Sequence, residues 1–192
     1  MELWDLVSGR TVMLDQVGSN VDDLEDRPEY WLQEQVPGFW SPDEQRVVLN
    51  VQRWTGGRID GAVASWDGVV VPLRLDMGDS AWPVGWVDDG RIGWLAVDGT
   101  GKSESARFIV SDTVGAVEAS YRLDLAPDSL ARGGLSQWSG WLSPDGSRLA
   151  LRYETTRMAE PSIAIFDVTT GRKLDRWRAH ITDTYGSLAW QG

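Results

Sequence analysis

The sequence has no cysteine and a single histidine, His180, among its 192 residues. The absence of cysteine excludes disulfide bonds and thiolate chemistry. One histidine cannot build a histidine-rich metal site, and no loop has the aspartate spacing of a calcium site. A catalytic dyad or triad needs a nucleophile and a carboxylate beside the imidazole, and no pattern in the sequence indicates them. We therefore expect no metal and no cofactor.

Positive charge and long apolar runs are also scarce. The 18 Lys and Arg residues are outnumbered by 29 Asp and Glu residues, which gives a net charge of −11. No basic patch offsets this charge, so no binding to nucleic acid is expected. No apolar stretch approaches the ~18 residues of a membrane-spanning helix, so no membrane span is expected. Residues 1–5 do not read as a signal or transit peptide, which predicts a cytoplasmic protein. An excised domain of an exported protein is the alternative.

Much of the negative charge lies in one stretch. Between Val21 and Glu44 there are eight acidic residues and one arginine, a net charge of −7. Such a stretch is ordinarily a solvated loop, and the alternative is a docking surface for a basic protein or peptide. Exposed aromatic side chains are common anchors at interfaces. The candidate partner-binding residues are therefore four carboxylates and two nearby aromatic residues, Asp22, Asp23, Glu25, Asp26, Tyr30 and Trp31.

Tryptophan and glycine are abundant, with 12 Trp and 21 Gly against 3 Phe, and tryptophan sets the register of an internal repeat. Trp40, Trp86, Trp141 and Trp190 follow one another at intervals of 46, 55 and 49 residues. The first three each precede a turn such as Ser-Pro-Asp, then an arginine, then an apolar run that reads as a strand. These strands are expected at Arg46–Val51, Arg91–Val97 and Arg148–Tyr153.

A second hairpin closes each repeat. Ile163–Arg172 and Leu3–Arg10 share an apolar residue, an aromatic residue, Asp, an apolar residue and then Ser or Thr before Gly-Arg. Ser65–Gly68 is a shortened copy and Phe108–Asp112 a looser one. Repeats of about 40 to 50 residues that each hold two hairpins are typical of four-stranded propeller blades.

The chain here resembles the WD-repeat propellers and the Tol-associated propeller repeats. The likeness is carried by Trp4-Asp5, Trp66-Asp67 and Phe166-Asp167, by the Ser-Pro-Asp-Gly turn, and by Arg178–Asp183, which is similar to a WD-repeat lead-in. It departs from the WD family because the Gly-His dipeptide is represented only by Ala179-His180. Within that lead-in, His180 is expected to make a structural hydrogen bond. The resemblance implies a scaffold whose loops bind a protein or a peptide.

The expected fold is all-β, a single and possibly partial β-propeller domain over residues 1–192. Because the repeat begins and ends within a blade, the ring has three possible completions. The chain is part of a longer propeller, closes as an imperfect four-bladed ring, or forms a homodimer in which two copies complete each other. The expected parts are three full four-stranded antiparallel blades at 36–77, 81–125 and 136–178, a split blade of 1–16 with 183–192, and the acidic insertion 17–35.

One motif favours a different function. Ala96–Ser103 satisfies a permissive phosphate-loop pattern, which ends in Gly-Lys-Ser and follows an apolar strand. A working phosphate loop runs into a helix whose amides face the phosphates. Here Arg107–Val110 reads as a strand instead, which favours a hairpin between two strands of a blade.

The sequence as a whole predicts a non-enzymatic scaffold for protein or peptide binding. The alternatives are a sensor or binding portion of a larger enzyme or exported protein and, less favoured, a nucleotide-binding enzyme. Four of the tryptophans are expected to pack between adjacent sheets rather than to bind a ligand. These are Trp40, Trp86, Trp141 and Trp190.

Overall fold

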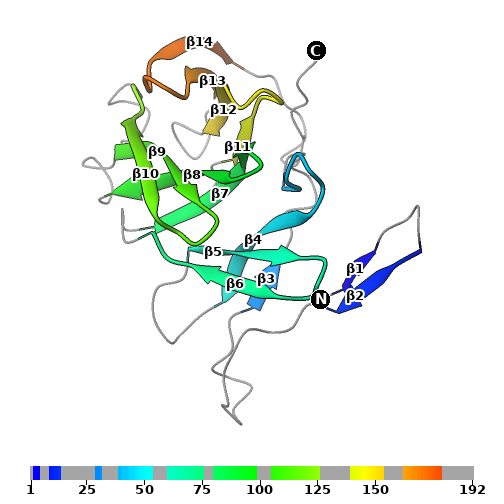
Figure 1. Cartoon of the computed structure of the whole chain (residues 1–192). Coiled ribbons are helices and arrows are strands. Elements are labelled where there is room, and N and C mark those ends of the chain that lie inside the picture. Colours follow the sequence, from blue (N-terminus) through cyan, green and yellow to red (C-terminus); the bar gives the residue numbers. More distant parts are fainter. Residues whose placement is uncertain are drawn as a thin grey trace.

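The fold is known from a computed structural model, shown in Figure 1. Within the residues that it describes, every regular element is a β-strand and every pairing is antiparallel. The all-β prediction is therefore confirmed for these residues. The described ranges are 2–4, 9–13, 29–31, 39–53, 60–75, 80–98, 105–125, 139–153 and 162–178.

The first sheet contains β3 (Glu29–Trp31), β4 (Arg46–Arg53), β5 (Gly61–Ser65) and β6 (Val70–Leu73) in chain order. β4 is strongly apolar and follows the Ser-Pro-Asp turn, as the repeat predicts. Before that turn, Trp40 pairs with Val47 through an isolated bridge.

The second sheet contains β7 (Ser80–Asp88), β8 (Arg91–Asp98), β9 (Ser105–Asp112) and β10 (Val117–Arg122), again in chain order. β8 and β9 are buried along most of their length, which makes this sheet the middle of the three. Both are rich in β-branched and aromatic residues, which suit a pleated strand with neighbours on both faces.

The third sheet contains β11 (Ser139–Leu142), β12 (Arg148–Tyr153), β13 (Ser162–Asp167) and β14 (Lys173–Arg178). A separate two-stranded sheet pairs β1 (Glu2–Trp4) with β2 (Thr11–Met13). All the strands expected from the tryptophan register and from the two Gly-Arg hairpins are present.

The acidic insertion requires a correction. The sequence places residues 17–35 outside the repeat, whereas Glu29–Trp31 forms β3 and pairs with β4, with Tyr30 opposite Val51 and Trp31 opposite Asn50. Tyr30 and Trp31 are therefore part of the first sheet. Asp22, Asp23, Glu25 and Asp26 lie outside the described residues.

The tryptophans that mark the repeat occupy two kinds of site. Trp86 and Trp141 are 5% and 3% exposed and belong to one hydrophobic core that draws on all three large sheets, as expected. The indole Nε1 of Trp86 donates to the carbonyl of Phe39 at 2.7 Å, which ties the second sheet to the first. Trp40 differs, because it is only partly buried and stacks on Trp66 with ring centroids 5.4 Å apart. Trp190 lies outside the described residues.

Neighbouring sheets meet through the same contact twice. The β9–β10 turn of the second sheet lies against the end of β6, where a Cβ placed on Gly115 would be 3.1 Å from the carbonyl oxygen of Arg74. The β13–β14 turn of the third sheet lies in the same way against the end of β10, where a Cβ on Gly171 would collide with the carbonyl oxygen of Arg122. The way in which the second sheet contacts the first is thus repeated where the third sheet contacts the second, and we call this repeated contact the step between sheets.

Candidate functional site

Six turns lie at one end of the sheets. Four of them join β7 to β8, β9 to β10, β11 to β12 and β13 to β14, and the other two lie before β4 and between β5 and β6. We call this end the turn face. Each of these turns contains an aspartate whose Oδ1 accepts the backbone N–H two residues later, at 2.9 to 3.1 Å. This local bond sets the turn and explains why aspartate recurs there. The six residues are Asp43, Asp67, Asp88, Asp112, Asp145 and Asp167.

These hydrogen bonds have an electrostatic consequence. The hydroxyl of Ser143, 2.5 Å from Asp145, together with the N–H and hydroxyl of Ser147, lowers the pKa of Asp145 from 3.8 to about 2. The hydroxyls of Ser41 and Ser65 likewise lower the pKa of Asp43 and of Asp67. Hydrogen bonds to the charged form favour ionisation. These carboxylates hold no proton near neutral pH, so they cannot act as general acids there.

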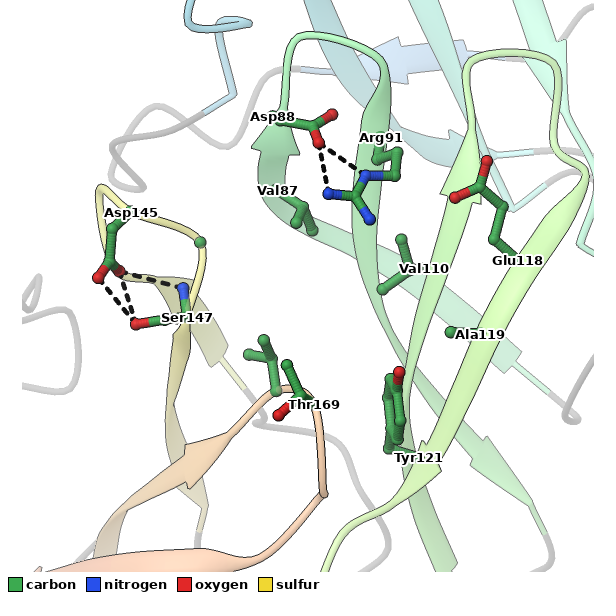
Figure 2. A pocket seen from close by; sticks show the side chains of 12 residues that line it. Val87, Asp88, Arg91, Val110, Glu118, Ala119, Tyr121, Asp145, Ser147 and Thr169 are labelled. Carbon is green, nitrogen blue, oxygen red and sulfur yellow. Dashed lines mark hydrogen bonds and ion pairs between the residues drawn. The ribbon is translucent and has the colours of Figure 1, made fainter.

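A groove opens on the turn face between the second and third sheets, with a volume of about 520 Å³ (Figure 2). We call it the inter-sheet groove. One wall comes from the second sheet: Val87, Asp88, Arg91, Val110, Glu118, Ala119 and Tyr121. The other wall comes from two turns of the third sheet: Asp145, Gly146, Ser147, Val168 and Thr169.

A bulge in β10 brings Glu118 to this groove. Val117 lies opposite Ser111 and Ala119 opposite Val110, so Glu118 is an extra residue with no partner on β9. Such an insertion changes the direction of the side chains around it. The side chains of Glu118, Ala119 and Tyr121 all line the groove.

An ion pair occupies the end of the same wall. Arg91 Nε lies 2.7 Å and its terminal nitrogen 2.5 Å from Asp88 Oδ2. The hydrogen bond that Arg91 donates to Asp88 raises the pKa of Arg91 and lowers the pKa of Asp88. Asp88 and Arg91 thus satisfy each other, and their charges cancel.

The polar groups of the opposite wall are largely satisfied within their own turns. Asp145 accepts from Ser143 and Ser147, and the Thr169 hydroxyl donates to Asp167 at 2.7 Å. By contrast, Glu118 and the Tyr121 hydroxyl make no hydrogen bond or ion pair among the residues that the structure describes, and they interact with Arg91 only through the charge that helps to raise its pKa. These two groups are available to a ligand.

None of the candidate partner-binding residues from the sequence is among the described residues that line the groove. Tyr30 and Trp31 are on β3, the outer strand of the first sheet, and the four acidic candidates are among the residues that are not described. The inter-sheet groove was not anticipated, because a bulge and a contact between distant turns leave no periodic signal. For Glu118 the sequence offers one signal: when the repeats are aligned, this glutamate stands where the next repeat has the apolar residue Leu174.

The phosphate-loop motif runs between two paired strands. Asp98 at the end of β8 lies opposite Ser105 at the start of β9, so the strand expected at Arg107–Val110 is confirmed. Lys102 and Ser103 themselves lie outside the described residues. A strand that begins at Ser105 leaves no room for the helix that a phosphate loop requires.

Several further features bear on what the chain can bind. His180 is outside the described residues. Among those that are described, no three acidic or histidine side chains gather as metal ligands. That part of the chain also contains no helix of the length and hydropathy needed to cross a membrane.

Comparison with known proteins identifies no family. No protein-family model matches the chain, and no curated protein matches it either.

Proposed function

We propose that this protein is a non-catalytic interaction scaffold of the β-propeller type, with the three large sheets as successive blades. The observation that carries the proposal is the repeated contact between neighbouring sheets, Gly115 on Arg74 and Gly171 on Arg122. Two equal steps in succession are what a radial array of blades requires. The sequence resemblance to WD-repeat and Tol-associated repeats supports the same architecture.

The small sheet fits this proposal as part of a further blade. β1 and β2 correspond in sequence to the second hairpin of each repeat, and Arg10 in their turn donates to the carbonyl of Trp66 at 2.8 Å. The guanidinium of Arg10 also lies 5.6 Å from the Trp66 ring centroid. A two-stranded hairpin is marginal by itself and needs further strands. Those strands come from residues 183–192, from a second copy, or from a longer chain.

The scaffold role follows from the chemistry of the turn face. Asp43 and Asp145 hold their own turns, and the hydrogen bonds that they accept lower the pKa of both, so both are ionised near neutral pH. The serine hydroxyls on this face, such as Ser41 and Ser143, donate to carboxylates whose pKa is lowered and which are therefore weak bases, so the face suits recognition more than turnover. We propose a protein or peptide as the partner and a homodimer as one way to complete the ring.

Site-directed photo-crosslinking tests the scaffold role. A photoreactive benzoylphenylalanine at Val114, which is 69% exposed on the turn face, or at Thr169 in the inter-sheet groove should give a discrete protein adduct. The adduct should be lost when excess unmodified protein competes. Ser120, exposed on β10 but outside the groove, is the matched control position and should give no adduct. Adducts of equal yield at all three positions would contradict the proposal.

Turnover assays test the enzymatic alternative. Incubation with ATP, with a generic ester and with a generic peptide should give no product above a buffer control. ATP hydrolysis that is lost on Lys102→Ala would instead establish a nucleotide hydrolase and overturn the scaffold proposal.

A further inference from the structure

We propose that the inter-sheet groove binds one lysine or arginine side chain from an extended segment of a partner protein, with Glu118 as the counter-charge. This rests on the proposed function, because it assigns the chemistry of the partner to one place on the turn face. The acidic stretch of residues 17–35 plays no part in it.

The charge of the groove selects a cation. Its lining holds three carboxylates, Asp88, Glu118 and Asp145, against Arg91, which leaves a net charge of −2. Asp88 is neutralised by Arg91. Asp145 accepts hydrogen bonds from Ser143 and Ser147 within its own turn, and it keeps its negative charge. Glu118 is thus the carboxylate that a ligand can pair with directly, and the net charge of −11 attracts cations to the whole molecule.

The remaining lining suits the stem of the same side chain. Val87, Val110 and Val168 supply an apolar surface, and the Tyr121 ring lies farther along the β10 wall than Glu118, beyond Ala119 (Figure 2). Lysine and arginine carry an aliphatic stem that packs on apolar groups while the charged head reaches a polar one. The face of a tyrosine ring also attracts a guanidinium or ammonium group. Arg91 supplies part of the counter-charge of Glu118, and a cationic side chain would complete it, because the lining as a whole keeps a net charge of −2.

The fold itself gives no reason for a carboxylate at this position. The third sheet has the same bulge, with Lys173 opposite Phe166 and Asp175 opposite Ile165, so that Leu174 is the extra residue there. Leu174 is 42% exposed and occupies the position equivalent to Glu118. Since the bulge accepts leucine, glutamate at residue 118 is not needed for folding, and its substitution is expected to leave the sheet intact.

The test is a titration of the isotope-labelled protein, followed by amide chemical shifts. The probes are acetyl-Leu-Arg-Leu-amide and its neutral counterpart, in which citrulline replaces arginine. The arginine peptide should shift the amides around Asp88, Glu118, Ser147 and Thr169 in a saturable way that weakens with added salt. The citrulline peptide should shift them much less. Equal shifts with both peptides, or no saturable shift with either, would overturn the assignment.

Two variants localise the effect. Glu118→Gln should raise the dissociation constant of the arginine peptide by about threefold, the size expected for an exposed ion pair. Asp124→Asn removes the same charge from an exposed residue just beyond β10 and outside the groove, so it should leave the constant nearly unchanged. Equal weakening by both variants would mean that only the net charge matters, which would overturn the assignment of Glu118.

The two proposals can fail separately. If a crosslinked partner forms at Val114 while the arginine peptide does not bind, the scaffold role stands and this groove assignment falls.

Discussion

At the scale of single residues, tryptophans at equivalent positions of the repeat differ in whether the indole N–H has a hydrogen-bond acceptor. The Trp86 indole donates to the Phe39 carbonyl, and the Arg46 guanidinium lies 5.3 Å from the Trp86 ring centroid. Trp141 is buried equally well, yet its Nε1 has no partner among the described residues. The acceptor equivalent to the Phe39 carbonyl would be the carbonyl of Gly85, where β7 has a register shift and a φ of 135°. A bulge at that point re-aims the backbone carbonyl.

This difference predicts unequal costs for the same substitution. Trp86→Phe should lower the free energy of unfolding by about 1 kcal/mol more than Trp141→Phe, because it removes the hydrogen bond from the Trp86 indole to the Phe39 carbonyl, which keeps only the N–H of Val48 as a donor. Trp141→Phe removes a donor that has no partner to lose. Urea unfolding of both variants, followed by far-ultraviolet circular dichroism, measures the two costs. Equal losses would contradict the inter-sheet bond of Trp86.

The turn aspartates predict a loss of stability in acid. The folded-state pKa is lowered for Asp43, Asp67, Asp88, Asp145 and Asp167, so their contribution is present above the unfolded value of 3.8 and is lost as pH falls through the folded value, about 2 for Asp145. The melting temperature should therefore fall between about pH 4 and pH 2. In Asp145→Asn, which cannot titrate, the fall over this interval should be shallower. An unchanged slope in that variant would show that Asp145 is not linked to folding.

At the scale of elements, the sequence was most informative where one strand follows one turn. β12 has the predicted bounds, and β4 and β8 extend the predicted strands by two residues and one residue. Each of these strands combines a turn signal, an arginine and an apolar run, which are local features. β3 was missed because three residues in an acidic stretch carry little pattern, although the pair Tyr30-Trp31 has high strand propensity. Glu118 was missed because a bulge depends on the register of two strands.

The contact between a turn and the next sheet predicts that a Gly→Ala substitution costs a different free energy of unfolding at Gly9 than at Gly171. Gly9 and Gly171 have nearly the same conformation, with φ of 70° and 68°, but nothing lies within 4 Å of a Cβ on Gly9. Gly9→Ala should cost about 1 kcal/mol, the penalty of a left-handed alanine. Gly171→Ala should cost about 1–3 kcal/mol more, because its methyl group would collide with the Arg122 carbonyl in the neighbouring sheet. Chemical unfolding measures both, and equal costs would contradict the turn-to-sheet contact.

At the scale of the whole molecule, three antiparallel sheets are joined by a repeated step, and a groove lies between the second and third. If the sheets are blades, as proposed, this step places equivalent turn residues at matching positions around one centre. Val69, Val114 and Thr169 are such residues, since each donates its N–H to the aspartate two residues earlier and each is exposed. Their mutual distances report the arrangement of the sheets directly.

The decisive measurement is the set of three distances between spin labels on these residues, taken pairwise by pulsed electron paramagnetic resonance. The chain has no cysteine, so each double-cysteine variant is labelled only at the chosen pair. We predict equal distances for 69–114 and 114–169, and a 69–169 distance longer by a factor of about 1.4 for four blades to about 1.85 for eight. Unequal first distances, or a factor of about 2 as in a straight stack of sheets, would contradict the radial arrangement.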